Sequence, residues 1–195
     1  VGTKWSEDSN VVKIRRNHFT DVPDDASYFD KLVWAVNNGI ISGSSATTFS
    51  PDNACTRYQF CVMLYKMMGR PDVDENATLP FTDVAENASY RKAVTWAYTN
   101  KIISGTSKTT FSPDAEVTRY QVVAVLYKLA GKPAIGDAEN PFTDVKKSDS
   151  YYNAVMWAVQ NKITGGTSKT TFSPKDTCKR YQMTVFLYKY YNLMN

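Results

Sequence analysis

The chain of 195 residues carries 23 Lys and Arg against 19 Asp and Glu, a net charge of +4, and 43% of its residues are hydrophobic. This composition is typical of a globular protein, and without a dense Lys/Arg block it argues against a nucleic-acid partner. No apolar run approaches the roughly 18 residues of a membrane span and nothing resembles a signal peptide, so we expect no membrane insertion.

Three similar units follow one another along the chain. Residues 1–18 form a predicted leader, and the repeats are predicted at 19–69, 81–131 and 142–192, separated by polar linkers that contain Pro. Each unit opens with Phe-Thr-Asp-Val. The start at Val1 predicts that the module belongs to a longer protein.

The first helix of each unit is predicted over 28–38, 90–100 and 151–161, because apolar residues recur there with the helical period. One tryptophan in each helix lies off this apolar stripe: Trp34, Trp96 and Trp157. These side chains either pack against a neighbouring unit or line a groove, and Trp is usually mostly buried.

A loop rich in hydroxyl groups follows each first helix. A glycine at one position of each copy predicts a positive φ or the close approach of another chain: Gly43, Gly105 and Gly166. The hydroxyls either satisfy the turn backbone or donate hydrogen bonds to a sugar. The three loops are not equivalent, since Lys108 and Lys169 stand where the first unit has Ala46.

The second helix of each unit is predicted over 57–68, 119–130 and 180–191. It is apolar on two faces, which predicts burial between partners, so we place the three second helices at the centre with the first helices and loops outside, one set per unit. No repeat has an obviously polar outer face, which favours closure over an open stack. The expected fold is therefore mainly α, with helix–loop–helix repeats closing into a pseudo-three-fold array around a central three-helix bundle.

Each second helix starts with the same arginine phrase, Thr-Arg-Tyr-Gln in two units and Lys-Arg-Tyr-Gln in the third. Thr-x-x-Gln predicts a capping box. A cation in the first turn opposes the helix dipole, by a few tenths of a kcal/mol up to about 1 kcal/mol. This suggests that the arginines have another use. They either form an anion site with the helix N–H groups or clamp the loop of the next unit, and they are Arg57, Arg119 and Arg180.

Catalysis and cofactor binding are not expected. The single histidine, His18, lies outside the repeats, and the cysteines are too few for a zinc cluster. The repeated aspartates are interpreted as turn or cap residues: Asp21, Asp83 and Asp144. Cys55 and Cys178 occupy equivalent positions and are either bridged or buried as free thiols.

The ordered landmarks resemble those of the S-layer homology domain in its triple array. In the first unit they are Phe19-Thr-Asp-Val22, Gly39-Ile-Ile-Ser-Gly43, Thr48-Phe-Ser-Pro51 and Thr56-Arg-Tyr-Gln59. The other units match likewise, with Lys101 and Lys162 in place of the first glycine. The resemblance implies a three-pronged module, part of a larger extracellular protein at a bacterial cell surface or wall. It implies a monomeric module that binds secondary cell-wall polysaccharide non-covalently, often one with pyruvate ketals, in grooves where the motif arginines meet the carboxylate.

Two departures from the family leave the ligand open. The motif glutamate is replaced at Gln59, Gln121 and Gln182, and the motif alanine at Tyr58, Tyr120 and Tyr181. The predicted ligand-binding set comprises the three arginines, these glutamines, the three tryptophans, the three loop glycines, Lys108 and Lys169. The alternatives are a surface module for protein interaction or assembly, and a site for a different carbohydrate in which aromatics dominate.

Overall fold

The computed structural model describes residues 18–74, 76–137 and 139–195, so the predicted leader lies outside the described residues apart from His18. Its named elements are all helices: α2 (Phe29–Asn37), α3 (Arg57–Met67), α4 (Arg91–Thr99), α5 (Arg119–Leu129), α6 (Tyr152–Gln160) and α7 (Arg180–Met194). The mainly α prediction is confirmed. The predicted ends agree closely, except that α7 continues to Met194 instead of ending near residue 191.

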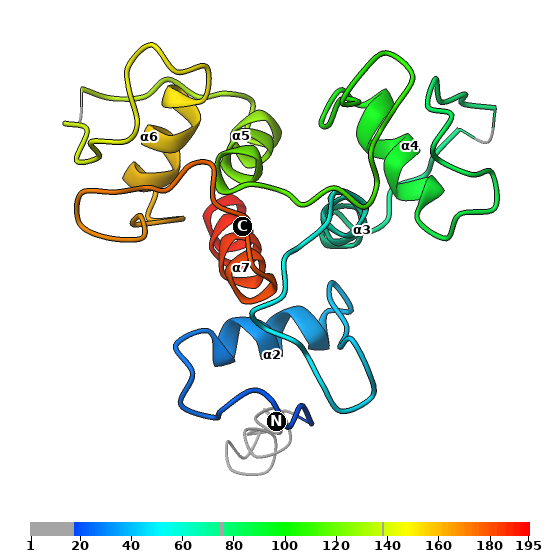
Figure 1. Ribbon diagram of the computed structural model, residues 1–195, viewed down its shortest axis with the longest axis horizontal. Coiled ribbons are helices and arrows are strands. Elements are labelled where there is room, and N and C mark those ends of the chain that lie inside the picture. The colour runs from blue at the N-terminus through cyan, green and yellow to red at the C-terminus, as the bar shows by residue number, and fades with distance from the viewer. Residues whose placement is uncertain (1–17, 75, 138) are drawn as a thin grey trace, which may run out of the picture.

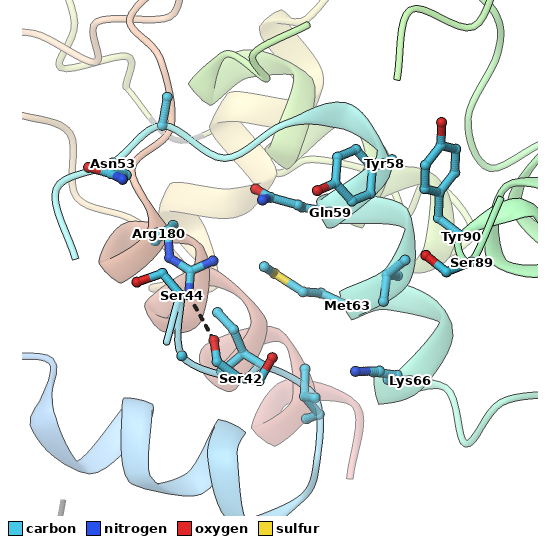
Figure 2. A pocket seen from close by; sticks show the side chains of 15 residues that line it. Ser42, Ser44, Asn53, Tyr58, Gln59, Met63, Lys66, Ser89, Tyr90 and Arg180 are labelled. Atoms are coloured by element: carbon cyan, nitrogen blue, oxygen red, sulfur yellow. Dashed lines mark hydrogen bonds between the residues drawn. The ribbon is translucent and has the colours of Figure 1, made fainter. Parts of the chain in front are cut away.

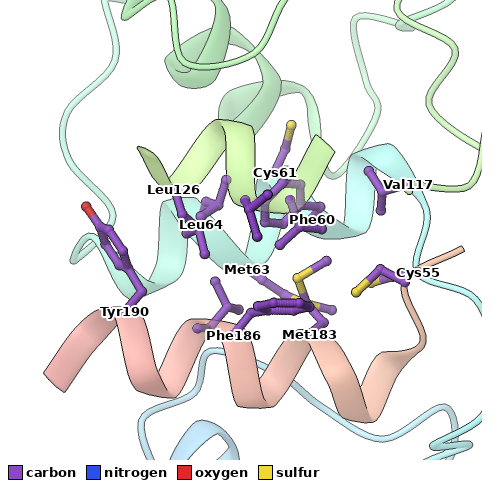
Figure 3. Close-up of a cluster of buried hydrophobic side chains, with 14 of the residues drawn as sticks. Cys55, Phe60, Cys61, Met63, Leu64, Val117, Leu126, Met183, Phe186 and Tyr190 are labelled. Atoms are coloured by element: carbon purple, nitrogen blue, oxygen red, sulfur yellow. The ribbon is translucent and has the colours of Figure 1, made fainter. Parts of the chain in front are cut away.

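The second helices of the repeats lie in the middle of the molecule. Figure 1 shows α3, α5 and α7 near the centre and α2, α4 and α6 further out, in three lobes. α7 contacts both α3 and α5, and the side chains between them include Leu64, Leu126 and Met183, all fully buried (Figure 3). Burial of one such leucine contributes about 1.5–3 kcal/mol, which explains why helices with two apolar faces take this position.

The outer helices pack across repeats. α4 contacts α3, α6 contacts α5 and α2 contacts α7, so each first helix lies on the second helix of another repeat. The expectation that the first helices lie outside, one per unit, is confirmed, whereas their packing on the central helix of another repeat was not predicted. The reason lies in the off-stripe tryptophans, which fill these helix pairs; Trp96, for example, lies 5.6 Å from the ring of Tyr65 on α3.

A closed set of backbone hydrogen bonds joins the three repeats just before their second helices. Cys55 donates to the carbonyl of Cys178 (2.9 Å), Cys178 to that of Val117 (2.8 Å), and Val117 to that of Cys55 (2.9 Å). The three cysteines are buried and free, so Cys55 and Cys178 are joined through their backbones and not through sulfur. The alternative of buried free thiols is confirmed.

The first helices end in the same way but with different residues. After α2, Gly39 has φ +63°, and the N–H groups of Gly39 and Ile40 donate to the carbonyls of Val36 and Ala35. This is the Schellman arrangement, in which glycine is favoured. Lys101 and Lys162 adopt φ +56° at the equivalent positions after α4 and α6, where a side chain costs about 1–2 kcal/mol.

The repeated aspartates hold the loops in place. Asp21 accepts the backbone N–H groups of Phe49 and Ser50 at 2.8 and 2.7 Å, and Asp83 and Asp144 do the same in their repeats. Desolvation raises the pKa of Asp21, but these N–H groups outweigh it and the pKa lies below its ordinary value. The expectation that these aspartates are turn or cap residues holds as far as a structural role, but the loop that they bond lies 28 residues further along the chain.

Candidate ligand-binding grooves between the repeats

The motif arginines join consecutive repeats. Arg57 donates from Nε to the carbonyl of Phe111 (2.8 Å) and from Nη2 to that of Ser104 (2.7 Å), both in the second repeat. Arg180 makes the same two bonds to Phe49 (2.9 Å) and Ser42 (2.8 Å), which links the third repeat to the first. The clamp interpretation is confirmed for these two arginines.

Arg119 makes only half of this clamp. Its Nε donates to the carbonyl of Phe172 at 2.9 Å, whereas its Nη2 is buried and has no hydrogen-bond partner among the described residues. The side chain is 4% exposed, and burial lowers the pKa of the guanidinium below its ordinary value. Because that ordinary value exceeds 12, the group stays charged.

The helix N–H groups expected to help bind an anion are already occupied. Arg57 N donates to the carbonyl of Ala115 (2.9 Å) and Tyr58 N to that of Pro113 (3.0 Å), and the first-turn N–H groups of α5 and α7 are bonded likewise. The neighbouring repeat therefore satisfies the helix start that sequence reasoning left open. The predicted combination of arginine and free helix N–H groups is wrong.

The motif glutamines cap their helices. The Oε1 atoms of Gln59, Gln121 and Gln182 accept the backbone N–H of the preceding Thr56, Thr118 and Lys179 at 3.0–3.1 Å. This is the glutamine half of the predicted capping box. Gln59 and Gln182 also line the hollows described next, while their oxygens serve the cap.

The Arg180 groove is a hollow of about 590 Å³ bounded by loop residues 40–44, the first turns of α3, Tyr90 and Arg180. Figure 2 shows Tyr58 and Tyr90 on one side, Ser42 and Ser44 on another, and Lys66 at one end. The described residues that line it include the cations Lys66 and Arg180 and no carboxylate.

The Arg119 groove is the equivalent hollow one repeat away, of about 420 Å³. It is bounded by loop residues 163–167, the first turns of α7, Ser27 and Arg119. The described residues that line it again include two cations, Arg119 and Lys189, and no carboxylate. Both volumes fall in the range of about 300–1,000 Å³ that small-molecule sites occupy.

Pairs of tyrosines form aromatic walls between repeats. Tyr58 lies 4.6 Å from Tyr90, Tyr120 lies 4.6 Å from Tyr151, and Tyr181 lies 4.9 Å from Tyr28, measured between ring centroids. Each pair joins a second helix to the repeat beyond it. The tyrosines that replace the motif alanine are thus in contact with a tyrosine at the start of another repeat's first helix, which sequence reasoning did not detect.

The tryptophans belong to the helix interfaces. Trp96 and Trp157 are 5% and 3% exposed, and Trp157 contacts the rings of Tyr127 and Tyr190. Trp34 is half-buried, with its ring 5.3 Å from Tyr188. The structure therefore places them in packing positions and not in either groove, although Trp96 also lines a separate hollow of about 420 Å³.

The loop glycines allow a close approach within the repeat itself. A Cβ on Gly43, Gly105 or Gly166 would lie within 3 Å of loop carbonyls and of the opening phenylalanine of the same repeat. Of the three, only Gly166 has a positive φ, +86°. They shape the loops, and Gly43 and Gly166 also line the two grooves.

The loop hydroxyls mainly bond one another. Ser45 Oγ lies 2.6 Å from Thr48 Oγ1 and accepts the Thr48 N–H at 3.0 Å, and the other loops repeat this pattern. This supports their role in the turn. Lys108 and Lys169 are exposed and lie outside the linings of both grooves.

Sequence reasoning missed the lysines that line the grooves. Lys66 and Lys189 lie three turns into the second helices, at the same repeat position as Lys128. The Tyr-Lys pair that recurs in each second helix was a signal that could have identified them. Among the described residues, no cluster of His, Cys, Asp and Glu could hold a metal ion, and no helix has the length and apolar character to cross a bilayer.

Comparisons with known proteins agree with the repeat pattern. The S-layer homology domain profile matches residues 18–61, 80–123 and 141–184. An endoglucanase from Bacillus sp. (strain KSM-635) is 28% identical over 182 residues, 91% of this chain and 19% of the endoglucanase. The surface-layer 125 kDa protein of Lysinibacillus sphaericus is 32% identical over 115 residues, 55% of this chain and 9% of that protein.

A cellulosome-anchoring protein of Acetivibrio thermocellus is 28% identical over 108 residues, 54% of this chain and 24% of the relative. The chain thus spans less than a quarter of each of these relatives. The shared part is the repeat region in proteins of different names. The similarity to an endoglucanase therefore gives no ground for assigning catalysis to this chain.

Proposed function

Because the chain belongs to the S-layer homology domain family, we propose that it is a non-covalent anchor of a larger bacterial surface protein. In this proposal its three repeats form a pseudo-three-fold, three-pronged module that binds an anionic secondary cell-wall polysaccharide in the grooves between repeats. Family membership and the names of the relatives support a place at the bacterial cell surface or wall.

The observation that carries the proposal is the charge and shape of the two grooves. Each pairs an arginine and a lysine with tyrosine and loop hydroxyl groups, and neither described lining has a carboxylate. Aromatic faces suit sugar rings, and unpaired cations suit an anionic polymer. The grooves lie between repeats, so a bound chain would contact more than one repeat at once.

The experiment is isothermal titration of the chain with secondary wall polysaccharide purified from the source organism. We expect binding that weakens as salt is raised, because surface charges are screened over about 10 Å at 0.1 M salt. A second titration uses polysaccharide from which pyruvate has been removed by mild acid. Loss of binding after this treatment would support a pyruvylated ligand, and absence of binding to either form would contradict the anchor proposal.

A second candidate, a different carbohydrate recognised mainly through aromatic contacts, is favoured by the tyrosine pair at the Arg180 groove. Tyr58 and Tyr90 present a wall that needs no charge on the sugar. In that case Tyr90→Ala would weaken binding more than Lys66→Gln, and removal of the polymer's carboxylates would have little effect. The charged-polymer proposal predicts the reverse order.

A further inference from the structure

The first helix of the first repeat leaves open a face that its two counterparts bury. Val33 and Trp34 on α2 are only half-buried. All three first helices pack on the second helix of another repeat, so these helix pairs do not account for the difference. The counterparts are 5% exposed or less, and they are Thr95 and Trp96 on α4 and Met156 and Trp157 on α6.

The linkers that lead into α4 and α6 lie against those two helices. Val73 in the first linker and Ile135 in the second pack against the hydrophobic core. Gln160, in the last turn of α6, donates from Nε2 to the carbonyl of Gly136 in the second linker at 3.2 Å. Pro71, in the first linker, lines a hollow together with the tryptophan of α4. A linker therefore covers the first helix of the second and third repeats.

The segment that precedes the first repeat has the same apolar spacing as these linkers. Val73 lies eight residues and Ile135 seven residues before the phenylalanine that opens the next repeat. Val11 and Val12 lie at the same two spacings before the phenylalanine that opens the first repeat. Both valines lie outside the described residues, and the described chain begins on the side of the molecule where α2 lies (Figure 1).

The end of α7 extends the open face of α2. The ring of Tyr191 lies 5.1 Å from that of Trp34, and Leu193 and Met194 beyond it are 41% and 51% exposed. Where α3 and α5 end before a glycine of positive φ, α7 has Asn192 and continues as a helix. No linker folds back over this helix pair in the described part of the chain, so apolar surface stays uncovered there.

Charge favours the preceding segment as the occupant of this face. Asp30 lies three and four residues before Val33 and Trp34, so the three share one side of α2. Asp30 is exposed, and no ion pair to it is found among the described residues. Residues 13–16 carry three cations and follow directly on the two valines. By contrast α4, whose linker is acidic, has Lys92 at the position of Asp30.

We propose that residues 8–17 pack along α2 and cover Val33 and Trp34 with Val11 or Val12. The cations of residues 13–16 then lie near Asp30, and the segment does for the first repeat what the linkers do for the other two. The folded module would thus begin about ten residues before its first motif. This contact is independent of the proposed anchor function, which concerns the grooves.

The direct test is NMR of the full chain with ¹³C-labelled valine methyl groups. We expect NOEs from the methyl groups of Val11 or Val12 to the ring of Trp34, and none to the tryptophans of the other two repeats. A mixture of labelled and unlabelled chains distinguishes contacts within one chain from contacts between two copies. NOEs only between copies, or none to Trp34, would overturn the inference.

Trypsin tests the charged part of the contact through its cleavage at residues 13–16. The matched variants are Asp30→Lys and Asn153→Lys, which introduce a cation at equivalent exposed positions of α2 and α6. Both carry the same cost against the helix dipole. We expect Asp30→Lys to speed this cleavage about threefold to fivefold, and Asn153→Lys to change it by less than about twofold. Equal rates for the two variants would contradict a contact with Asp30.

A double-mutant cycle tests the apolar part with the same cleavage. Changing Val11→Asp and Val12→Asp together should speed it about tenfold or more, because apolar side chains lose their buried contact. In a chain that already carries Trp34→Ala, the same change should have little further effect, and circular dichroism confirms that each variant is folded. Additive effects would show that the valines do not contact Trp34 and would overturn the inference.

Discussion

Replacing Arg57 by leucine should destabilise the protein more than the same change at Arg119. Arg57→Leu removes two hydrogen bonds from a charged donor and leaves the carbonyls of Phe111 and Ser104 without their partner. Hydrogen bonds of charged groups contribute about 1.5–3 kcal/mol each. The bond to Ser104 is exposed and therefore lies at the lower end of this range. We expect the free energy of unfolding to fall by about 3–4 kcal/mol. Both arginines also lie over a phenylalanine ring, at 4.7 and 4.9 Å, and Arg119 lies over a second ring, Phe186, at 5.6 Å, which adds about 0.5–1 kcal/mol to the cost of its removal.

Arg119→Leu removes one such bond and also the buried donor that has no partner. Its cost should therefore be smaller, about 1–2 kcal/mol, because removal of an unsatisfied charged group offsets part of the loss.

Urea unfolding followed by circular dichroism measures both free energies, and thermal unfolding should separate the variants by about 4–8 °C in Tm. A loss at Arg119 equal to or larger than that at Arg57 would show that Arg119 is as fully satisfied as its counterpart. The reasoning from the missing Nη2 bond would then be refuted.

Three further results are expected. Lys101→Gly should raise the free energy of unfolding in urea by about 0.5–1 kcal/mol because it relieves φ +56°, and an unchanged or lower value would contradict this. The Asp21 carboxylate, whose pKa the fold lowers, should stabilise the protein above its unfolded pKa of about 4 and lose this contribution as pH falls through the folded value. The difference in free energy of unfolding between the parent and Asp21→Asn should therefore become smaller as the pH is lowered. A constant difference from pH 7 to pH 3 would contradict this prediction. Burial raises the pKa of the Cys55 and Cys61 thiols to about 12. A disulfide reagent at pH 8 should therefore label these thiols only when urea has unfolded the protein, because the thiolate is the reactive form. Rapid labelling of the native protein would contradict their burial.

Local pattern was enough to predict what lies within one repeat. The helical period located the six helices, and Thr-x-x-Gln correctly predicted that Gln59 closes onto the N–H of Thr56. Both features depend on residues whose relative positions the chain itself nearly determines. The repeated Asp21 was assigned to a turn, but its partners, the N–H groups of Phe49 and Ser50 in the loop of the same repeat, were not predicted.

Contacts between repeats could not be derived in this way. The partner of Arg57 is a carbonyl 47 residues away and that of Arg180 one 138 residues away, so both depend on how whole repeats are placed. The same holds for Tyr58 and Tyr90, which face each other from different repeats. The positive φ of Gly166 is subtler, since its sequence signal is Ile-Thr-Gly-Gly in one loop where the other two have Ile-Ile-Ser-Gly.

The contact of the last repeat with the first has a consequence for cooperativity. In a linear array of repeats the outermost units lack one neighbour and open first. Here Arg180 and the backbone of Cys178 and Cys55 give the first and third repeats partners on both sides. Unfolding from one end would have to begin by breaking this junction, after which only the second repeat keeps both of its neighbours. Slow-exchanging amides in α3, α5 and α7 should therefore share one opening free energy, and the module should fail under load in a single step.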